Sequence, residues 1–288
     1  MIFDSMITNQ SINQFSLLET VPAVLRARDF RLYAKGGKRL VDLWQNGGAA
    51  ILGHTPPSML REIKNTASRG LYAPFPHFLE ARLKKALSII LPGRNFLLYA
   101  APPHELEALV AQGTAAIWRP FSNEKDPDPR SPIPDPRSPV LIPVIPGIQG
   151  WRLVDGLPMP LGLCALAIDP GQSISLPPGD FLPPVLLAAA ARGIYDLIAA
   201  VPQRAKCNFP RIAKALNSGS SRWKRQSRCS LYLSLKETPS KEEWGGLFRR
   251  FLDAGFLLPP VSAQPLILPG ILSPGEEAKL AGLFLGAE

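Results

Sequence analysis

Residues 29–56 constrain the fold of this chain more than any other stretch. Two short apolar runs, at 30–34 and 39–44, flank the turn Lys35-Gly36-Gly37-Lys38. Glycines between two apolar runs are typical of a β-hairpin. Gly47, Gly48 and Gly53 follow the second run. Glycine permits sharp turns and close approach of the backbone to a ligand or another chain. The stretch therefore predicts a β-hairpin that leads into a glycine-rich loop.

Length and composition place the chain among globular proteins. A chain of 288 residues is long enough for one or two domains with a sizeable core. Its 46% hydrophobic and 19% charged residues exclude a disordered protein. The 32 prolines predict short helices and extended connections.

Helices and strands are expected to be mixed along the chain. Amphipathic spacing, together with flanking Pro and Gly residues, predicts helices at 57–69, 78–90, 105–112, 181–200 and 241–254, and a last helix opened by the capping box of Ser273 and Glu276. Short β-type runs predict strands at 23–28, 95–100, 140–145 and 230–235. The apolar run 181–201 contains Arg192 and Asp196, which favours a buried helix over a membrane span.

The run RLVDLWQNGGAAILGHTPPSMLREI (39–63) resembles the N-terminal signature of class III aminotransferases, closest to the glutamate-1-semialdehyde aminomutase branch. The family pattern is matched by Arg39, Asp42, Gly48, Leu52, Gly53, His54 and Pro57. A helix with Leu79, Glu80 and Leu83 and the C-terminal run GFLLPPVSAQPL also resemble the family. The resemblance covers about 20–115 and 150–288, in order.

The resemblance implies an α/β, fold-type I architecture with a reduced large domain. The large domain is expected at 76–203, with a proline-rich loop at 122–139 where the family has a larger insert. The small domain is expected to combine 1–75 with 204–288. Because the family pocket lies between subunits, the resemblance also implies a homodimer or pairing with an active relative.

Each segment that would hold pyridoxal phosphate departs from the family pattern. The phosphate-binding Ser-Gly-Thr-Glu-Ala turn is replaced by Ala100-Ala101-Pro102-Pro103-His104-Glu105, and the two prolines lack N–H donors. The strand that should end in the aspartate partner of the pyridine nitrogen reads VLIPVIPGIQ, without an acid. Trp151 stands at the position implied for the Schiff-base lysine, and no lysine lies between Lys125 and Lys206.

These losses predict a catalytically silent aminotransferase-like protein, or pseudoenzyme. No catalytic residue and no bound cofactor are expected, and binding of a small amino-acid-like ligand is possible. The resemblance places a pocket rim at Trp44, Asn46, Gly47 and Gly48, with His54 and Trp151 as further candidates. The alternative for the glycine-rich loop is a plain tight connection, and for His54 a structural hydrogen bond, which we favour.

Two other functions are considered. The first is an active class III aminotransferase or aminomutase whose pyridoxal phosphate is held by Lys206 or Lys125. The second is a nucleic-acid-binding protein using 204–228, which holds eight basic residues, no acid and Trp223. A solvated loop is the preferred interpretation of that basic stretch, so nucleic acid is not an expected partner.

Targeting and metal signals are not evident in the sequence. The N-terminus lacks the basic and apolar regions of a signal peptide, and we expect a cytoplasmic protein without a membrane anchor. Cys164, Cys207 and Cys229 form no CxxC pair, and they suggest no metal site with only three histidines (His54, His77 and His104).

Overall fold

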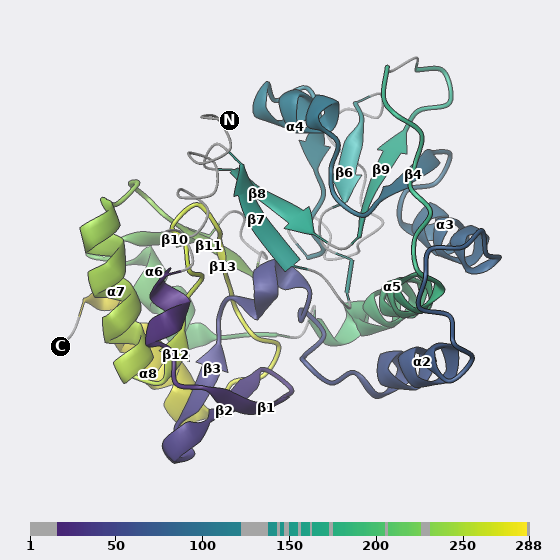
Figure 1. Cartoon of the computed structure of the whole chain (residues 1–288). Coiled ribbons are helices and arrows are strands. Elements are labelled where there is room, and N and C mark those ends of the chain that lie inside the picture. Colours follow the sequence, from purple (N-terminus) through teal and green to yellow (C-terminus); the bar gives the residue numbers. More distant parts are fainter. Residues whose placement is uncertain are drawn as a thin grey trace, which may run out of the picture.

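The computed structural model describes residues 16–121, 138–142, 145–146, 150–154, 157–161, 163–172, 175–204, 207–225 and 231–286. Within these ranges the chain is a mixture of helices and short strands (Figure 1). The predicted α/β fold class is therefore confirmed. The division into two domains stays a prediction, because the main hydrophobic cluster runs through both parts, from Leu32 and Leu87 to Phe251.

The first sheet joins the beginning of the chain to its C-terminal part. Its order is β1 (Val24–Arg28), β2 (Arg31–Ala34), β3 (Arg39–Asp42) and β12 (Phe256–Leu257). The first three strands are antiparallel, and the predicted turn between β2 and β3 is the short 3-10 segment η2 (Lys35–Gly37). β12 pairs in parallel with β3 through Phe256 and Val41. A further 3-10 segment, η1 (Ser16–Thr20), precedes β1.

A second sheet and three helices pack beside the first sheet. The sheet order is β10 (Trp223–Arg225), β11 (Tyr232–Leu235) and β13 (Leu266–Ile267). The helices are α6 (Pro210–Asn217), α7 (Lys241–Asp253) and α8 (Pro274–Leu285). The Trp223 ring lies 6.1 Å from the Phe251 ring and 5.7 Å from the Phe284 ring, between centroids. These rings close the core between the sheet, α7 and α8.

The third sheet has the order β4 (Asn95–Tyr99), β9 (Cys164–Ile168), β6 (Val140–Ile142) and β5 (Ala116–Ile117). α2 (Pro57–Ala67), α5 (Pro184–Arg204) and α3 (Leu79–Ile90) lie side by side (Figure 1). α4 (His104–Ala111) follows β4 directly. A separate hairpin of β7 (Gly150–Val154) and β8 (Leu157–Leu161) lies near the centre of the molecule (Figure 1).

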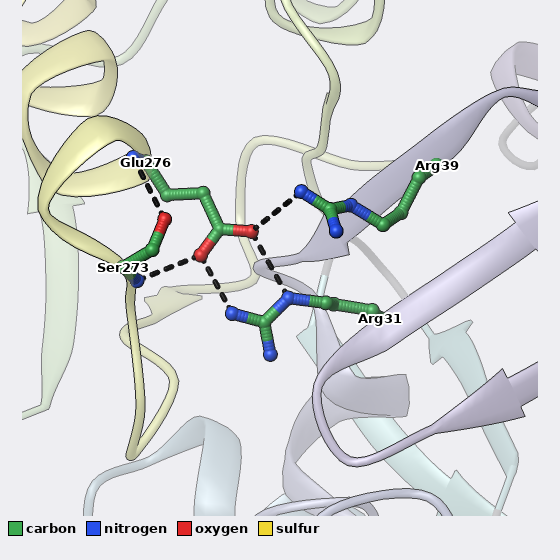
Figure 2. A network of polar contacts seen from close by, with 4 residues as sticks. All are labelled: Arg31, Arg39, Ser273 and Glu276. Carbon is green, nitrogen blue, oxygen red and sulfur yellow. Dashed lines mark hydrogen bonds and ion pairs between the residues drawn. The ribbon is translucent and has the colours of Figure 1, made fainter.

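An ion-pair network holds α8 against the N-terminal hairpin (Figure 2). Glu276 accepts hydrogen bonds from Arg31 Nε and Nη2 at 3.0 and 2.6 Å, and Arg39 Nη2 lies 3.5 Å from the same carboxylate. The predicted capping box is confirmed, since Ser273 Oγ accepts the Glu276 N–H and the Glu276 carboxylate accepts the Ser273 N–H. One glutamate therefore caps a helix and ties the two chain ends together.

The structure corrects three details of the predicted elements. β3 ends at Asp42 instead of continuing to Trp44, because the Asp42 side chain starts a turn. α5 does not stop before Pro202 but continues to Arg204, and only its last turn loses a backbone hydrogen bond there. The basic stretch 204–228 is not a plain loop, since it includes α6 and β10. The prediction of a buried helix in the apolar run 181–201 is confirmed. The helix is α5, and Leu187, Ile194 and Leu197 are among its buried residues.

α5 is the one helix of the described ranges that is long and apolar enough, by length and composition, to cross a membrane. In the structure it packs against α2 and α3, and half of its most apolar window is buried.

Candidate functional site

Asp42 organises the glycine-rich loop that follows β3. Its carboxylate is buried, and Oδ1 accepts the N–H groups of Trp44 and Gln45 at 2.9 and 2.8 Å. Oδ2 lies 2.8 Å from His54 Nε2. The His54 backbone N–H also donates to the Asp29 carbonyl at 2.7 Å. A single carboxylate thus fixes the beginning and the end of the loop.

The loop itself, η3 (Gln45–Gly48), has an uncommon backbone conformation. Gln45, Asn46, Gly47 and Gly48 have φ values of 50, 48, 67 and 108°. A left-handed conformation is costly for residues other than glycine, and asparagine tolerates it better than glutamine. The Gln45 side chain is buried and donates through Nε2 to the Ile267 carbonyl at 3.1 Å, which anchors the loop to β13.

The structure brings most of the predicted pocket-rim residues together. Trp44 lies at the start of η3, and η3 itself contains Asn46, Gly47 and Gly48. The β7 strand, which carries Trp151, lies against η3 (Figure 1). The Trp151 backbone pairs with Pro160. His54 points to Asp42, which is the structural role favoured from the sequence.

Two buried side-chain atoms of the loop have no hydrogen-bond partner within the described ranges. They are Trp44 Nε1 and Gln45 Oε1. Gln264 is also buried, and neither polar atom of its amide has a partner in this part of the chain. Buried polar groups without partners cost free energy, so they mark places where a ligand could supply a partner.

The turn between β4 and α4 does not fit a cofactor phosphate. Pro102 and Pro103 have no N–H, and Pro103, at the N-cap of α4, forms no side-chain cap. The Ala100 N–H donates to Asp180 Oδ2 at 2.9 Å. A carboxylate therefore already occupies a donor of this turn, where a phosphate would need free donors and no negative neighbour.

Further contacts hold Asp180 at this turn. The Asp180 N–H donates to the Leu98 carbonyl at 2.8 Å, and a Cβ at Gly179 would lie 2.9 Å from the same oxygen. Burial raises the pKa of Tyr99 to about 12, and the charges of Cys164, Asp180 and Glu105 act in the same direction. The negative charges of Asp180 and Glu105 therefore both act on Tyr99, at the end of β4. They would also repel a further anion bound at this turn. Asp180 directly precedes the helix predicted at 181–200, and nothing in the sequence indicates that its side chain reaches Ala100.

The basic residues of 204–228 are partly used within the protein. Arg211 Nη1 donates to the Pro274 carbonyl at 3.4 Å while its backbone N–H donates to Glu277 Oε1 at 2.8 Å, and Arg222 Nη2 lies 3.6 Å from Glu243 Oε1. Trp223 is buried in the aromatic cluster and does not offer a surface on which a base could stack. Lys206 and Arg228 lie outside the described residues, as does most of the loop 122–139. No group of three His, Cys, Asp or Glu residues that could hold a metal occurs within the described ranges.

Comparison with other sequences gives no functional name. No protein-family model matches the sequence. An uncharacterized protein of Treponema pallidum (strain Nichols) is 26% identical over 303 residues, which is 89% of this chain and 92% of the relative. An uncharacterized protein of Borreliella burgdorferi is 45% identical over 60 residues, 21% of this chain and 22% of the relative.

Comparison with solved structures identifies the fold. An ornithine delta-aminotransferase of Plasmodium falciparum matches with a TM-score of 0.62 and 11% identity over 92% of each chain. An omega-transaminase from Sphaerobacter thermophilus has a TM-score of 0.60 and 12% identity, over 92% of this chain and 90% of that one. A serine palmitoyltransferase from S. paucimobilis has a TM-score of 0.62 and 11% identity over 99% and 97%. The chain has the fold-type I aminotransferase fold.

Proposed function

We propose that this chain is a non-catalytic relative of the class III aminotransferases, nearest in descent to the glutamate-1-semialdehyde aminomutase branch. It keeps the fold and acts by binding a small amino-acid-like ligand or by pairing with a second subunit. The observation that carries the proposal is the hydrogen bond from Ala100 N–H to Asp180, which places a carboxylate in the turn that would hold the cofactor phosphate. We further propose a cytoplasmic location.

The sequence around this turn supports the same conclusion. No lysine occurs from residue 126 to residue 205, so the segment around Trp151, where the resemblance implies the Schiff-base lysine, offers no amine for a covalent bond to pyridoxal phosphate. No acid occurs from residue 138 to residue 154, so this stretch offers no carboxylate that would stabilise a protonated pyridine nitrogen and so favour the ring as an electron sink. The anion site, the amine and the acid that pyridoxal phosphate would need are thus each absent from the segment in which the resemblance implies them.

The residues present therefore fit pyridoxal phosphate poorly, and we assign no reaction step to this cofactor. A fold of this type hosts more than one function, so the function must come from the site. The loop from Trp44 to Gly48 keeps the position that rims the pocket in the resemblance, and its unpaired buried atoms favour binding. Exposed aromatic side chains at Tyr72, Phe75 and Phe78 support pairing with another subunit.

An absorption titration tests the proposal. Purified protein is titrated with pyridoxal phosphate, and bound cofactor is measured by visible absorption and by equilibrium dialysis. We expect no saturable band and no retention at one equivalent per chain. A saturable band at one equivalent would instead support an active aminotransferase that uses Lys206 or Lys125.

A further inference from the structure

Two arginines from distant parts of the chain converge on one buried tyrosine. Arg119 follows β5, Arg204 ends α5, and Tyr232 lies on β11. Arg119 Cζ lies 5.8 Å from the centroid of the Tyr232 ring, which is completely buried. Both arginine charges act on the Tyr232 hydroxyl and favour its ionised form, against the larger effect of burial, which raises its pKa. The charges of both guanidinium groups therefore reach the same buried side chain.

The Arg204 guanidinium is held in place on three sides. Its Cζ lies 5.0 Å from the Phe30 ring centroid and 5.7 Å from that of Phe121. Its Nη2 donates to the Ile51 carbonyl. A Cβ at Gly270 would overlap the guanidinium, so the missing side chain at this position makes room for it. These contacts orient the group before any ligand arrives.

One nitrogen of this oriented group remains unused. Arg204 Nη1 is buried and has no hydrogen-bond partner within the part of the chain that the structure describes. A buried charged donor without an acceptor is costly, since it has lost water and gained nothing in exchange. An oxygen placed beside Nη1 would remove this cost.

The charge of Arg204 is also poorly balanced. Burial lowers its pKa, and the opposing interactions are the charge and a side-chain hydrogen bond of Cys207 and the charge of Tyr232, neither of which is a carboxylate. Burial also lowers the pKa of Arg119. An anion bound beside Arg204 Nη1 would offset the penalty of burying Arg204, because charge-assisted hydrogen bonds in a buried setting are strong.

This cluster borders the glycine-rich loop. Gln45 donates to the Ile267 carbonyl, and Ile267 is the strand partner of Tyr232. Ile51, which accepts from Arg204, follows the same loop. The buried arginines and the loop from Trp44 to Gly48 thus belong to one region of the molecule.

We propose that Arg204, together with Arg119 and Tyr232, binds a small oxyanion, the carboxylate or phosphate group of a small-molecule ligand. Arg204 Nη1 would donate a hydrogen bond to the oxyanion, while Nη2 donates to the Ile51 carbonyl. Arg119 would add a second positive charge. The site is separate from the turn at Ala100, which a carboxylate already occupies. The expectation of an amino-acid-like ligand rests on the proposed function, whereas the anion site does not.

Isothermal titration calorimetry on the full chain tests this site. The probes are L-glutamate, acetate and inorganic phosphate, each titrated into wild-type protein, Arg204→Gln, Gly270→Ala and the control Arg61→Gln. Arg61 lies exposed on α2 and matches the charge change. We expect saturable binding of at least one probe, unchanged in the control and about tenfold weaker or more in Arg204→Gln. Gly270→Ala should weaken binding as well, because it displaces the guanidinium.

The outcomes separate the two proposals. Binding of carboxylates alone or of phosphate alone identifies the group that the site takes. Absence of saturable binding by wild-type protein, or equal binding by Arg204→Gln and Gly270→Ala, would overturn the anion site. If Arg204→Gln does not fold by circular dichroism, the wild-type and Gly270→Ala titrations decide. If none of the oxyanion probes binds, the proposed absence of cofactor chemistry is not affected, because the pyridoxal phosphate titration tests that proposal separately.

Discussion

The carboxylate of Asp180 accepts the backbone N–H of Ala100 at 2.9 Å, across 80 residues of sequence, at the turn between β4 and α4. The chain from Pro177 to Asp180 also covers β4, since the Tyr99 hydroxyl donates to the Pro177 carbonyl at 2.8 Å and the Asp180 N–H donates to Leu98. The turn is therefore closed by the protein itself, and a carboxylate is already present at the turn where the resemblance implies a cofactor phosphate.

Replacing Asp180 with alanine should destabilise the turn modestly. The Ala100 N–H would lose a charged acceptor, but the bond is exposed, so we expect a loss of about 1 kcal/mol in unfolding free energy. Asp180→Asn keeps an acceptor oxygen and should lose less. Urea denaturation measures both variants. An Asp180→Ala protein as stable as wild type would show that this hydrogen bond does not hold the turn.

The Glu276 network should make stability depend on pH in the acid range. Despite partial burial, which acts to raise its pKa, hydrogen bonds from Arg31 and Ser273 lower the Glu276 pKa below 4.5. A carboxyl group with a lowered folded pKa stabilises the fold fully above its unfolded pKa, and this contribution is lost as pH falls through the folded value. Glu276→Gln should therefore cost about 2 kcal/mol at pH 7 and progressively less below pH about 4.5.

The matched control for Glu276 is Glu242. It lies exposed in the first turn of α7, as Glu276 lies in the first turn of α8. Glu242→Gln should change stability by less than about 0.5 kcal/mol at every pH. A constant difference between Glu276→Gln and wild type from pH 7 to pH 3 would contradict the assigned role of the ion pair.

Asp42 should be among the most sensitive positions of the chain. Asp42→Ala would leave the N–H groups of Trp44 and Gln45 and the His54 ring without their acceptor, and we expect a loss of about 3 kcal/mol. His54→Ala removes one of these bonds and should cost about 1 kcal/mol. Asp169→Ala is the control, since its carboxylate accepts a turn N–H from Gly171 at an exposed site. Equal losses in Asp42→Ala and Asp169→Ala, measured by urea denaturation, would refute the organising role of Asp42.

The exposed aromatics between α2 and α3 should mediate pairing. Tyr72, Phe75 and Phe78 are 63, 50 and 68% exposed. We expect light scattering to give twice the chain mass for wild type and the single-chain mass for the Phe75→Ser, Phe78→Ser double variant. Ile271→Ser, which also removes an exposed apolar side chain, should leave the mass unchanged. A wild-type protein that is monomeric alone and with aminotransferase relatives would refute pairing.

Local patterns in the sequence predicted the elements that depend on neighbouring residues. The hairpin around Gly36 and Gly37, the helix α3 and the capping box of Ser273 and Glu276 all follow from residues within a few positions of each other. Such signals act through turn conformation, amphipathic spacing and capping, which are physically local. They were sufficient for most helices, whereas the α/β, fold-type I architecture was implied by the resemblance.

Contacts between distant residues could not be derived in this way. Nothing in the sequence indicates that the charges of Arg119 and Arg204 act on Tyr232, because buried charges become neighbours only after the fold forms. The left-handed conformation of Gln45 depends on a hydrogen bond to Ile267, 222 residues away. The hairpin of β7 and β8 was also missed, since Pro158 and Pro160 argue against a strand unless the strand lies at an edge.

Borohydride trapping tests the absence of a cofactor-binding lysine most directly. Purified protein is incubated with pyridoxal phosphate and reduced, and its lysine peptides are mapped by mass spectrometry. We expect only scattered labelling of lysines, well below one equivalent at any position. One adduct at stoichiometric level on a single peptide, such as that of Lys206 or Lys125, would contradict it and support an active aminotransferase.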